Sequence, residues 1–374
     1  MPNQENISIY AVGDVAVTRD NPESAFSQTL SVLNEPDILF GQLEATLSQK
    51  GSPKTESAQR PHPTIGAVLK SAGFDVMSFA SNHVLDWGPD GLIDTLDIAQ
   101  ENGISLVGAG REINEARQPA IIERNGVKIA FLAYNSILPP GFWATDDKPG
   151  CVPIRVRTFY EPTEPLQPGS PAEVFTFAYR EDVQAMVEDI KKARAVADVV
   201  VVSMHWGIHF MPAKLAMYQK EVGHAAIDAG ADLIIGTHPH ILKGIEVYNG
   251  KVIFYSLGNF AMDSSVTKVW PHVPARWRKH EVLCNFTIDP EWGPTYPFPA
   301  DSRKTIIVKC TVSDRKIETV SFLPALIVKP NQPQILTRDD VNFDEVVKYV
   351  NWICDDQNLS TKLTAEGNEV FITI

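Results

Sequence analysis

Polar residues with metal-binding side chains follow several apolar segments of this chain. The segment Gly236-Thr237-His238-Pro239-His240 places two of the nine histidines one residue apart, directly behind the apolar run ADLII. Similar polar groups end four other apolar runs: Gly13-Asp14, Gln42-Leu43-Glu44, Ser81-Asn82-His83 and His205-Trp206-Gly207. Carboxylate, amide and imidazole groups together suit zinc, manganese or iron, and a carboxylate can bridge two such ions. We therefore expect a site for one or two divalent metal ions.

The elements that must position these groups are strands. From residue 7 to about residue 135, short apolar runs alternate with helix-like stretches, which predicts an α/β sheet. The pattern returns in a helix over 180–198, a strand over 199–207 and a helix over 215–230. Because the carboxyl ends of parallel strands meet at one edge of a sheet, polar groups that are far apart in the sequence can come together there.

Each of these residues, taken singly, has a simpler interpretation. Asp14 after a glycine is typical of a turn, and Glu44 could cap the next element. Asn82 could hold a turn, and His83 could be a core histidine. The shared position of all five groups at strand ends favours the metal site over these alternatives.

The rest of the chain predicts two further features. Many prolines over 136–178 indicate a long surface loop that could cover a site, with Trp143 as a candidate wall of the substrate cleft. After the Asn249-Gly250 hairpin signal, strands and a helix with a regular apolar face close the chain. We expect one domain over 1–300, with the strands and helix of 301–374 packed on it.

Composition excludes several classes of partner. The formal net charge is -13, from 33 basic and 46 acidic residues, which argues against binding to a nucleic-acid backbone. No apolar run approaches the roughly 20 residues of a membrane span, and no signal peptide is recognisable, so we expect a cytoplasmic protein. The four cysteines form no C-x-x-C pair, which indicates buried thiols rather than a metal knuckle. The sequence is compatible with a homo-oligomer and does not decide the oligomeric state.

Five motifs together make the chain similar to a known family. They are AVGDVAVTRD, QLEATLS, AGFDVMSFASNHVLDWG, VVVVSMHWG and IDAGADLIIGTHPHILKGIEVYNGKVIFYSLGNF. The set resembles the CapA-type poly-γ-glutamate capsule biosynthesis family, which is itself similar to calcineurin-like metallophosphoesterases. The likeness runs in order from about residue 7 to residue 262. It implies a four-layer α/β sandwich with a metal centre at the sheet edge, followed by a strand-rich and helical extension.

The resemblance also implies roles for individual residues. Asp14 and His240 would bind a first metal, and Glu44 would be the bridging carboxylate. The implied ligands of the second metal are Asn82, His205 and His238. His83 would face the substrate as a general acid for the leaving group.

Arg19 and Arg60 fall where the family carries arginines, which could hold a carboxylate or phosphate in two hydrogen bonds. Surface solvation is the simpler interpretation for both. The chain departs from metallophosphoesterases at Ala16, where these enzymes carry a histidine, so one metal ion is favoured over two. It also carries His209 near the position of an acidic residue, and this imidazole could be a replacement ligand or a substrate contact.

These features predict a metal-dependent hydrolase that uses a metal-activated water. The family name favours an amide bond, γ-glutamyl-like or lactam, in a small or peptide-like acidic substrate. Phosphoester cleavage is the second hypothesis. The third is a non-catalytic accessory protein of poly-γ-glutamate synthesis.

Overall fold

The structure is a computed structural model that describes residues 6–55, 58–62, 64–263, 291–292 and 296–374. Of these residues, ten strands form the first sheet: β1 (Ile7–Ala16), β2 (Ile38–Leu43), β3 (Phe74–Ser78), β4 (Ser105–Val107), β15 (Asn259–Met262), β16 (Lys304–Ser313), β17 (Lys316–Val328), β18 (Gln332–Ile335), β19 (Leu363–Glu366) and β20 (Glu369–Ile372). Strand β1 lies inside this sheet, parallel to β2 and antiparallel to β16. The sheet is therefore mixed, and both edges of β1 are hydrogen-bonded.

The second sheet has six strands in the order β13-β14-β12-β11-β7-β6. These strands are β6 (Ala120–Arg124), β7 (Val127–Asn135), β11 (Val199–His205), β12 (Leu233–Thr237), β13 (Ile245–Tyr248) and β14 (Lys251–Phe254). The four inner strands run parallel. Every side chain of β11 is buried, as expected for a parallel strand that is covered on both faces.

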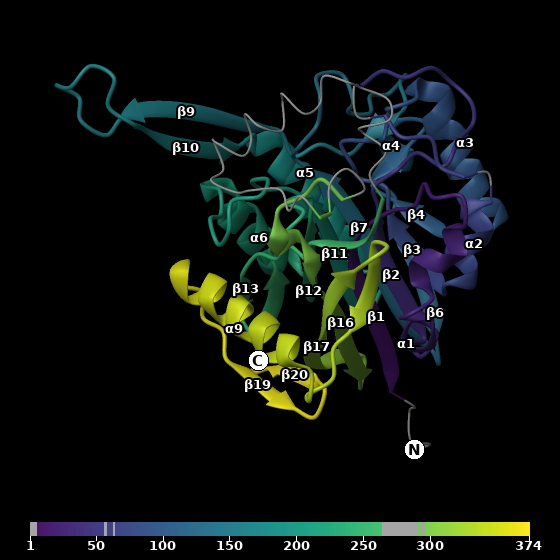
Figure 1. Ribbon diagram of the computed structural model, residues 1–374. Helices are drawn as coiled ribbons and strands as arrows, with labels where there is room; N and C mark the ends of the chain where they lie inside the picture. The colour runs from purple at the N-terminus through teal and green to yellow at the C-terminus, as the bar shows by residue number, and fades with distance from the viewer. Residues whose placement is uncertain (1–5, 56–57, 63, 264–290, 293–295) are drawn as a thin grey trace.

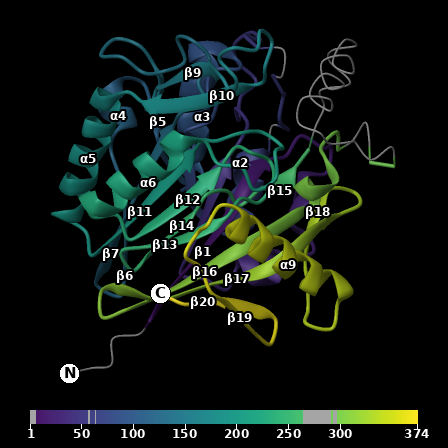
Figure 2. The same ribbon diagram turned by 90° about the vertical axis from the view of Figure 1, so that its left-hand side faces the viewer.

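The two sheets pack face to face, with helices on the outside of each (Figures 1 and 2). Between the sheets, the rings of Phe40 and Phe131 stack with their centroids 5.6 Å apart. Helices α2 (Ile65–Ser71) and α3 (Gly88–Glu101) cover the first sheet, and α5 (Arg180–Arg194) and α6 (Met217–Ala229) cover the second. The expected four-layer α/β sandwich is thus confirmed. Shorter helical segments are η1 (Pro22–Phe26), α1 (Leu30–Leu33), α4 (Ile113–Ala116) and η2 (Ala300–Arg303).

The C-terminal strands continue the first sheet. Strand β16 pairs with β1 over five residue pairs, from Ile7↔Val312 to Ala11↔Val308, and then forms a hairpin with β17. Helix α9 (Val341–Asp356) lies over β17 and buries the apolar face that includes Phe343 and Val350 (Figure 2). The division at residue 300 stays a prediction, since the strands on either side of it share one sheet.

The expected loop over 136–178 is wrong for its second half. Strands β9 (Val156–Pro162) and β10 (Ala172–Ala178) form an antiparallel hairpin that projects away from the body of the molecule (Figure 1). Within the hairpin, Pro162 ends β9 and Pro165, Pro168 and Pro171 lie between the strands, where a backbone N–H is not needed for pairing. Earlier in the segment, β8 (Gly150–Cys151) pairs with β5 (Ala109–Gly110).

Two expectations from composition can be compared with the structure. None of the helices in the described residues is both long enough and apolar enough to cross a lipid bilayer. Cys151, Cys310 and Cys354 are free and buried, and burial raises the pKa of each thiol. Cys284 lies outside the described residues.

Candidate metal centre

The ends of strands from both sheets meet at the candidate metal centre. Asp14 lies near the end of β1, and Glu44 directly follows β2. His205 is the last residue of β11, and His238 directly follows β12. All four residues are almost fully buried. The two sheets therefore contribute carboxylates and imidazoles, respectively, to one place.

Glu44, His205 and His238 form the tightest group of possible ligands. One ligand atom of each lies within 4.8 Å of the others. His205 Nε2 is 3.5 Å from Glu44 Oε1 and 2.7 Å from Asn82 Oδ1. Four residues that the sequence assigned to metal binding thus converge here.

The other nitrogen of His205 fixes how its ring is oriented. Thr237 Oγ1 donates a hydrogen bond to Gln42 Oε1 at 3.3 Å and lies 3.0 Å from His205 Nδ1. With its proton directed to Gln42, the hydroxyl oxygen accepts a hydrogen bond from Nδ1–H. The other ring nitrogen, Nε2, then faces Asn82 and Glu44 and is the atom that would ligate a metal ion.

Unsatisfied buried atoms indicate that a cation fits this group. Among the described residues, nothing donates a hydrogen bond to Asp14 Oδ1 or Glu44 Oε1, His238 Nδ1 has no hydrogen-bond partner, and Asp14 Oδ2 has only the imidazole of His240 at 3.4 Å. Leaving a buried polar atom without a partner costs about 1–3 kcal/mol, and more for a charged group. These atoms are the oxygen and nitrogen donors that zinc, manganese or iron would take.

Asp14 and His240 form a second pair beside Glu44. His240 Nδ1 lies 3.4 Å from Asp14 Oδ2 and 2.7 Å from Asn259 Oδ1. The strand register places Asn259 directly opposite Asp14, and its amide also donates to Tyr296 Oη at 2.8 Å. Asn259 was not predicted, although it is a polar residue that follows the apolar run before Gly258. Ala16, buried at the end of β1, offers no ligand.

Local electrostatics separates the ionisable groups of the site. Burial and the neighbouring Asp14 raise the pKa of Glu44 to about 7. Burial and the surrounding histidines hold the pKa values of His205 and His238 well below 6.5, so both rings are neutral. Burial lowers the pKa of His240, but Asp14 outweighs this effect and raises it. Neutral imidazole is the form that ligates a metal ion.

The backbone around Pro239 is strained. His238 has φ +94° and His240 has φ +57°, which few residues other than glycine adopt. Such conformations cost about 1–3 kcal/mol each and are concentrated at functional sites. Here they turn two alternate side chains of one segment toward the site, with ring centroids 6.1 Å apart.

His83 lies at the edge of the group and is held by a carboxylate. Its Nε2 is 3.8 Å from Glu44 Oε1, and its Nδ1 is 2.7 Å from Asp86 Oδ2. Burial lowers the pKa of His83, but Asp86 and Glu44 outweigh it and raise the pKa to about 9. Asp86 was not predicted, and its only signal in the sequence was the spacing of three residues from His83.

The two arginines proposed to hold substrate make structural contacts. Arg19 pairs with Asp263 through two of its nitrogens, with Nη2–Oδ1 at 2.6 Å. The guanidinium of Arg60 lies over the ring of Trp87 at 3.4 Å, and its Nη1 donates to Ser48 O. A substrate role for either arginine stays a prediction.

His209 adjoins the proposed ligands, whereas Trp143 lies in the segment before the hairpin. The ring of His209 stacks on that of His238, with centroids 4.0 Å apart, so it adjoins the proposed ligands. The ring of Phe210 stacks on those of His209 and His240, and the ring of Phe298 also lies against His240. Trp143 is half-buried, and its backbone forms an isolated β-bridge with Cys151 in the segment before the hairpin.

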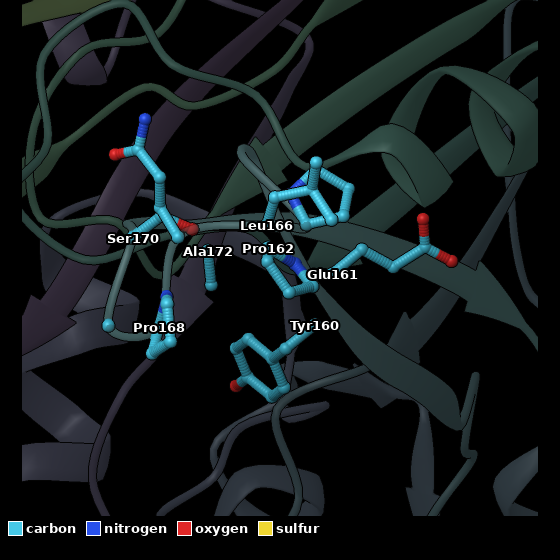
Figure 3. A pocket seen from close by; sticks show the side chains of 10 residues that line it. Tyr160, Glu161, Pro162, Leu166, Pro168, Ser170 and Ala172 are labelled. Carbon is cyan, nitrogen blue, oxygen red and sulfur yellow. The ribbon is translucent and has the colours of Figure 1, made fainter.

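A hollow of about 530 Å³ lies elsewhere, at the tip of the β9–β10 hairpin (Figure 3). Its lining includes Tyr160, Pro162, Leu166 and Pro168. None of the proposed metal ligands lines it. The chemistry of the buried ligand group, rather than the size of a hollow, therefore identifies the candidate site.

Comparison with known proteins relates this geometry to a family. The model described as "Bacterial capsule synthesis protein PGA_cap" matches residues 8–264, a range that includes every proposed metal ligand. The chain is 30% identical over 274 residues to the PGA biosynthesis protein CapA of Bacillus subtilis (strain 168), covering 70% of this chain and 65% of that protein. It is also 30% identical over 278 residues to the capsule biosynthesis protein CapA of Bacillus anthracis, covering 71% and 62%. The match thus spans less than two thirds of the length of these two relatives.

Among solved structures, the calcineurin-like phosphoesterase YfkN from Bacillus subtilis is similar to this chain, with a TM-score of 0.42 and 14% sequence identity. The match covers 94% of this chain and 97% of that one.

Proposed function

Because this chain belongs to the bacterial capsule synthesis protein family PGA_cap, we propose that it is a metal-dependent hydrolase of an amide bond in a glutamate-containing, peptide-like substrate. The family match confirms the resemblance that the motifs predicted. The observation that carries the proposal is the buried group of unsatisfied ligand atoms on Glu44, His238 and Asp14, next to the half-buried His83.

In this proposal, the chain holds the cation through both sheets. Asn82, His205 and His238 bind one divalent ion, and Asp14 and His240 bind a second if two are present. Glu44, whose Oε1 is 3.5 Å from His205 Nε2, would be the carboxylate shared by the two groups. Such an ion supplies Lewis acidity, which polarises a substrate oxygen and makes water a nucleophile near neutral pH.

His83 supplies the proton that the leaving nitrogen needs. Its Nδ1 faces Asp86, so the proton available to substrate is on Nε2, which points to the Glu44 side of the ring. The raised pKa of His83 keeps this proton in place at neutral pH. A positioned acid of this kind contributes about 10²- to 10⁴-fold to a rate.

An amide is favoured because the relatives are named for the biosynthesis of PGA, whose units the family resemblance identifies as γ-linked glutamate. Phosphoester cleavage is the second candidate. It is supported by the presence of two donor groups, Glu44 with His205 and His238, and Asp14 with His240, since paired metals stabilise both oxygens of a phosphoryl displacement. A non-catalytic accessory role in capsule synthesis is the third.

The test combines metal content with turnover. The wild type, His238→Ala, His83→Ala and the control His224→Ala are analysed by elemental mass spectrometry. His224 is a suitable control because it pairs with Glu246 instead of the site residues. Each protein is then assayed on γ-glutamyl-p-nitroanilide and on p-nitrophenyl phosphate.

We expect one or two metal equivalents in the wild type and in His224→Ala, and a loss in His238→Ala. His83→Ala should keep its metal and lose about 10²- to 10⁴-fold in amide turnover. Turnover of the phosphate ester alone would favour the second candidate. Bound metal with no turnover on either probe would favour the accessory role, and a wild type that binds no metal would overturn the proposal.

A further inference from the structure

The β9–β10 hairpin is an exposed arm with apolar side chains on both faces. Phe159 is 49% exposed, Tyr160 70% and Phe177 46%. Among the described residues, no third strand pairs with either edge of this two-stranded sheet. An isolated hairpin is marginally stable in water, and its open edges are ready to pair with another strand. The arm therefore has the properties of an interface.

The base of the arm is held rigidly against the body. Arg155 forms two hydrogen bonds with Asp182, from Nη2 to Oδ1 at 2.6 Å and from Nε to Oδ2 at 2.8 Å. On the other strand, Tyr218 N donates to Thr176 Oγ1 at 3.3 Å. These contacts fix the direction of the arm, which lowers the entropy cost of binding through it.

One face of the arm contains an unfavourable pair of like charges. The register places Glu161 directly opposite Glu173, next to the pair Phe159 and Phe175. Like charges directly opposite each other destabilise a sheet. This face therefore fits a partner strand that brings a cation to Glu161 and an aromatic ring to Phe159.

The strand itself has this complementary sequence. Residues 157–161 read Arg-Thr-Phe-Tyr-Glu. If two copies pair antiparallel with Phe159 on the two-fold axis, Arg157 of each copy lies opposite the partner's Glu161. We propose that the free edge of β9 pairs with the same edge of a second copy of this chain, so that the arms join two molecules in one four-stranded sheet.

The pairing gives the shared face a regular composition. Its central row contains Phe175 and Phe159 from each copy, and aromatic cross-strand pairs contribute about 0.2–1 kcal/mol each. On either side of this central row, the guanidinium of Arg157 from one copy reaches the Glu161–Glu173 pair of the other copy. The Arg157 side chain is exposed, with its guanidinium 4.6 Å from the Tyr179 ring centroid, so it is available to an acceptor on a second copy.

Two features make a second copy the fitting occupant. A two-fold interface uses the same surface on both subunits, which requires a self-complementary strand such as 157–161. The paired stretch also ends where it must, because Pro162 has no N–H to donate and the tip beyond it is rich in proline (Figure 3). This inference is independent of the proposed hydrolase activity.

Charge reversal tests the register. Sedimentation velocity over a concentration series is measured for the wild type, Arg157→Glu, Glu161→Arg and the double variant with both changes. Glu164→Arg, at the tip and outside the paired stretch, is the matched control. Glu161→Arg is informative because it removes the repulsion with Glu173 within the hairpin while creating repulsion across the interface.

We expect the wild type and Glu164→Arg to dimerise, each single variant to weaken dimerisation at least about tenfold, and the double variant to restore it. A monomeric wild type would overturn the proposal. So would a single variant that dimerises like the wild type, or a double variant that stays monomeric while circular dichroism shows it folded.

A cysteine at the two-fold axis provides a second test. Strand partners lie about 4.5–5.5 Å apart between Cα atoms, which a disulfide can span. Phe159→Cys should therefore form a covalent dimer on mild oxidation, and Thr163→Cys should not. Equal cross-linking of both variants, or of neither, would contradict pairing centred on Phe159.

Discussion

Glu44 is the residue at which metal binding and stability are most directly opposed. Nothing in the described part of the chain donates a hydrogen bond to its buried Oε1, and burial together with Asp14 raises its pKa to about 7. We expect Glu44→Gln to stabilise the metal-free protein by about 1–3 kcal/mol above pH 7, where the wild-type carboxylate must be charged. The same change should remove the extra stability that added Zn²⁺ or Mn²⁺ gives the wild type.

Thermal unfolding with chelator and with each metal measures both effects. Ser48→Ala is a control, because Ser48 is a nearby buried residue whose hydroxyl bonds Asp94 rather than the site. A Glu44→Gln protein that metal stabilises as much as the wild type would remove Glu44 from the ligand set.

Asp86 is a positioning residue for His83. It accepts a hydrogen bond from Thr55 Oγ1 at 2.6 Å while its other oxygen faces His83 Nδ1, so its own orientation is fixed. We expect Asp86→Asn to lower kcat of the proposed hydrolase about 10- to 100-fold, less than removal of the acid itself, with KM and metal content unchanged. Steady-state kinetics and elemental analysis check this, and a loss of metal would show that Asp86 supports the ligands instead.

At the residue scale, the sequence predicted the side chains that end apolar runs, but not the partners they acquire in the fold. Glu44 and His238 directly follow strands and His205 ends one, positions that the alternation of apolar and helix-like segments reveals. Asn259 reaches His240 only because β15 pairs with β1, a contact between residues far apart in the chain. Arg19, a proposed substrate contact, pairs with Asp263, a residue that nothing in the sequence singles out.

Gly13 permits the close approach of β1 and the segment before β15. A Cβ atom at this position would lie 1.9 Å from Gly258 O, the atom that accepts the hydrogen bond from Asp14 N. We expect Gly13→Ala to destabilise the protein by about 1–3 kcal/mol or more and to lower metal affinity, because Asp14 would shift away from His240. Urea unfolding and metal titration measure the two effects.

Gly223→Ala in α6 is the matched control, since its Cβ would meet only ordinary contacts at 3.4 Å or more. Alanine also favours a helix interior, so this variant should be neutral or slightly more stable. Equal destabilisation of both variants would show that the Gly13 contact has no special role.

At the element scale, strong local signals were sufficient for most of the fold. The Asn249-Gly250 turn joins β13 and β14 as expected, with positive φ at both residues. One of the helix-like stretches before residue 135, over residues 24–35, forms only two short segments, η1 and α1, and the arm was expected to be a loop. In both cases the local pattern was too weak to define the element. The arm lacks the buried face that produces an alternation of apolar and polar residues.

The C-terminal strands are part of the framework of the whole molecule. Strand β16 occupies one edge of β1, the strand that carries Asp14. We therefore expect a chain that ends at residue 300 to lose its cooperative unfolding transition, because β1 and the core beneath it would be exposed. Circular dichroism during urea unfolding measures this.

Replacement of the exposed tip 163–171 by Asn-Gly is the control for removing residues, since it leaves both sheets intact. This variant should unfold cooperatively at nearly the wild-type urea concentration. A chain ending at residue 300 that folds equally well would make residues 301–374 a separate unit.

The position of β1 between β2 and β16 also imposes an order on biosynthesis. Strand β1 ends at Ala16, whereas β16 begins at Lys304. At a translation rate of roughly 5–20 residues per second, β1 leaves the ribosome about 15–60 seconds before its neighbour exists. During that interval the edge of β1 that will pair with β16 is open in the nascent chain, so the first sheet cannot be completed until the last fifth of the polypeptide has been made.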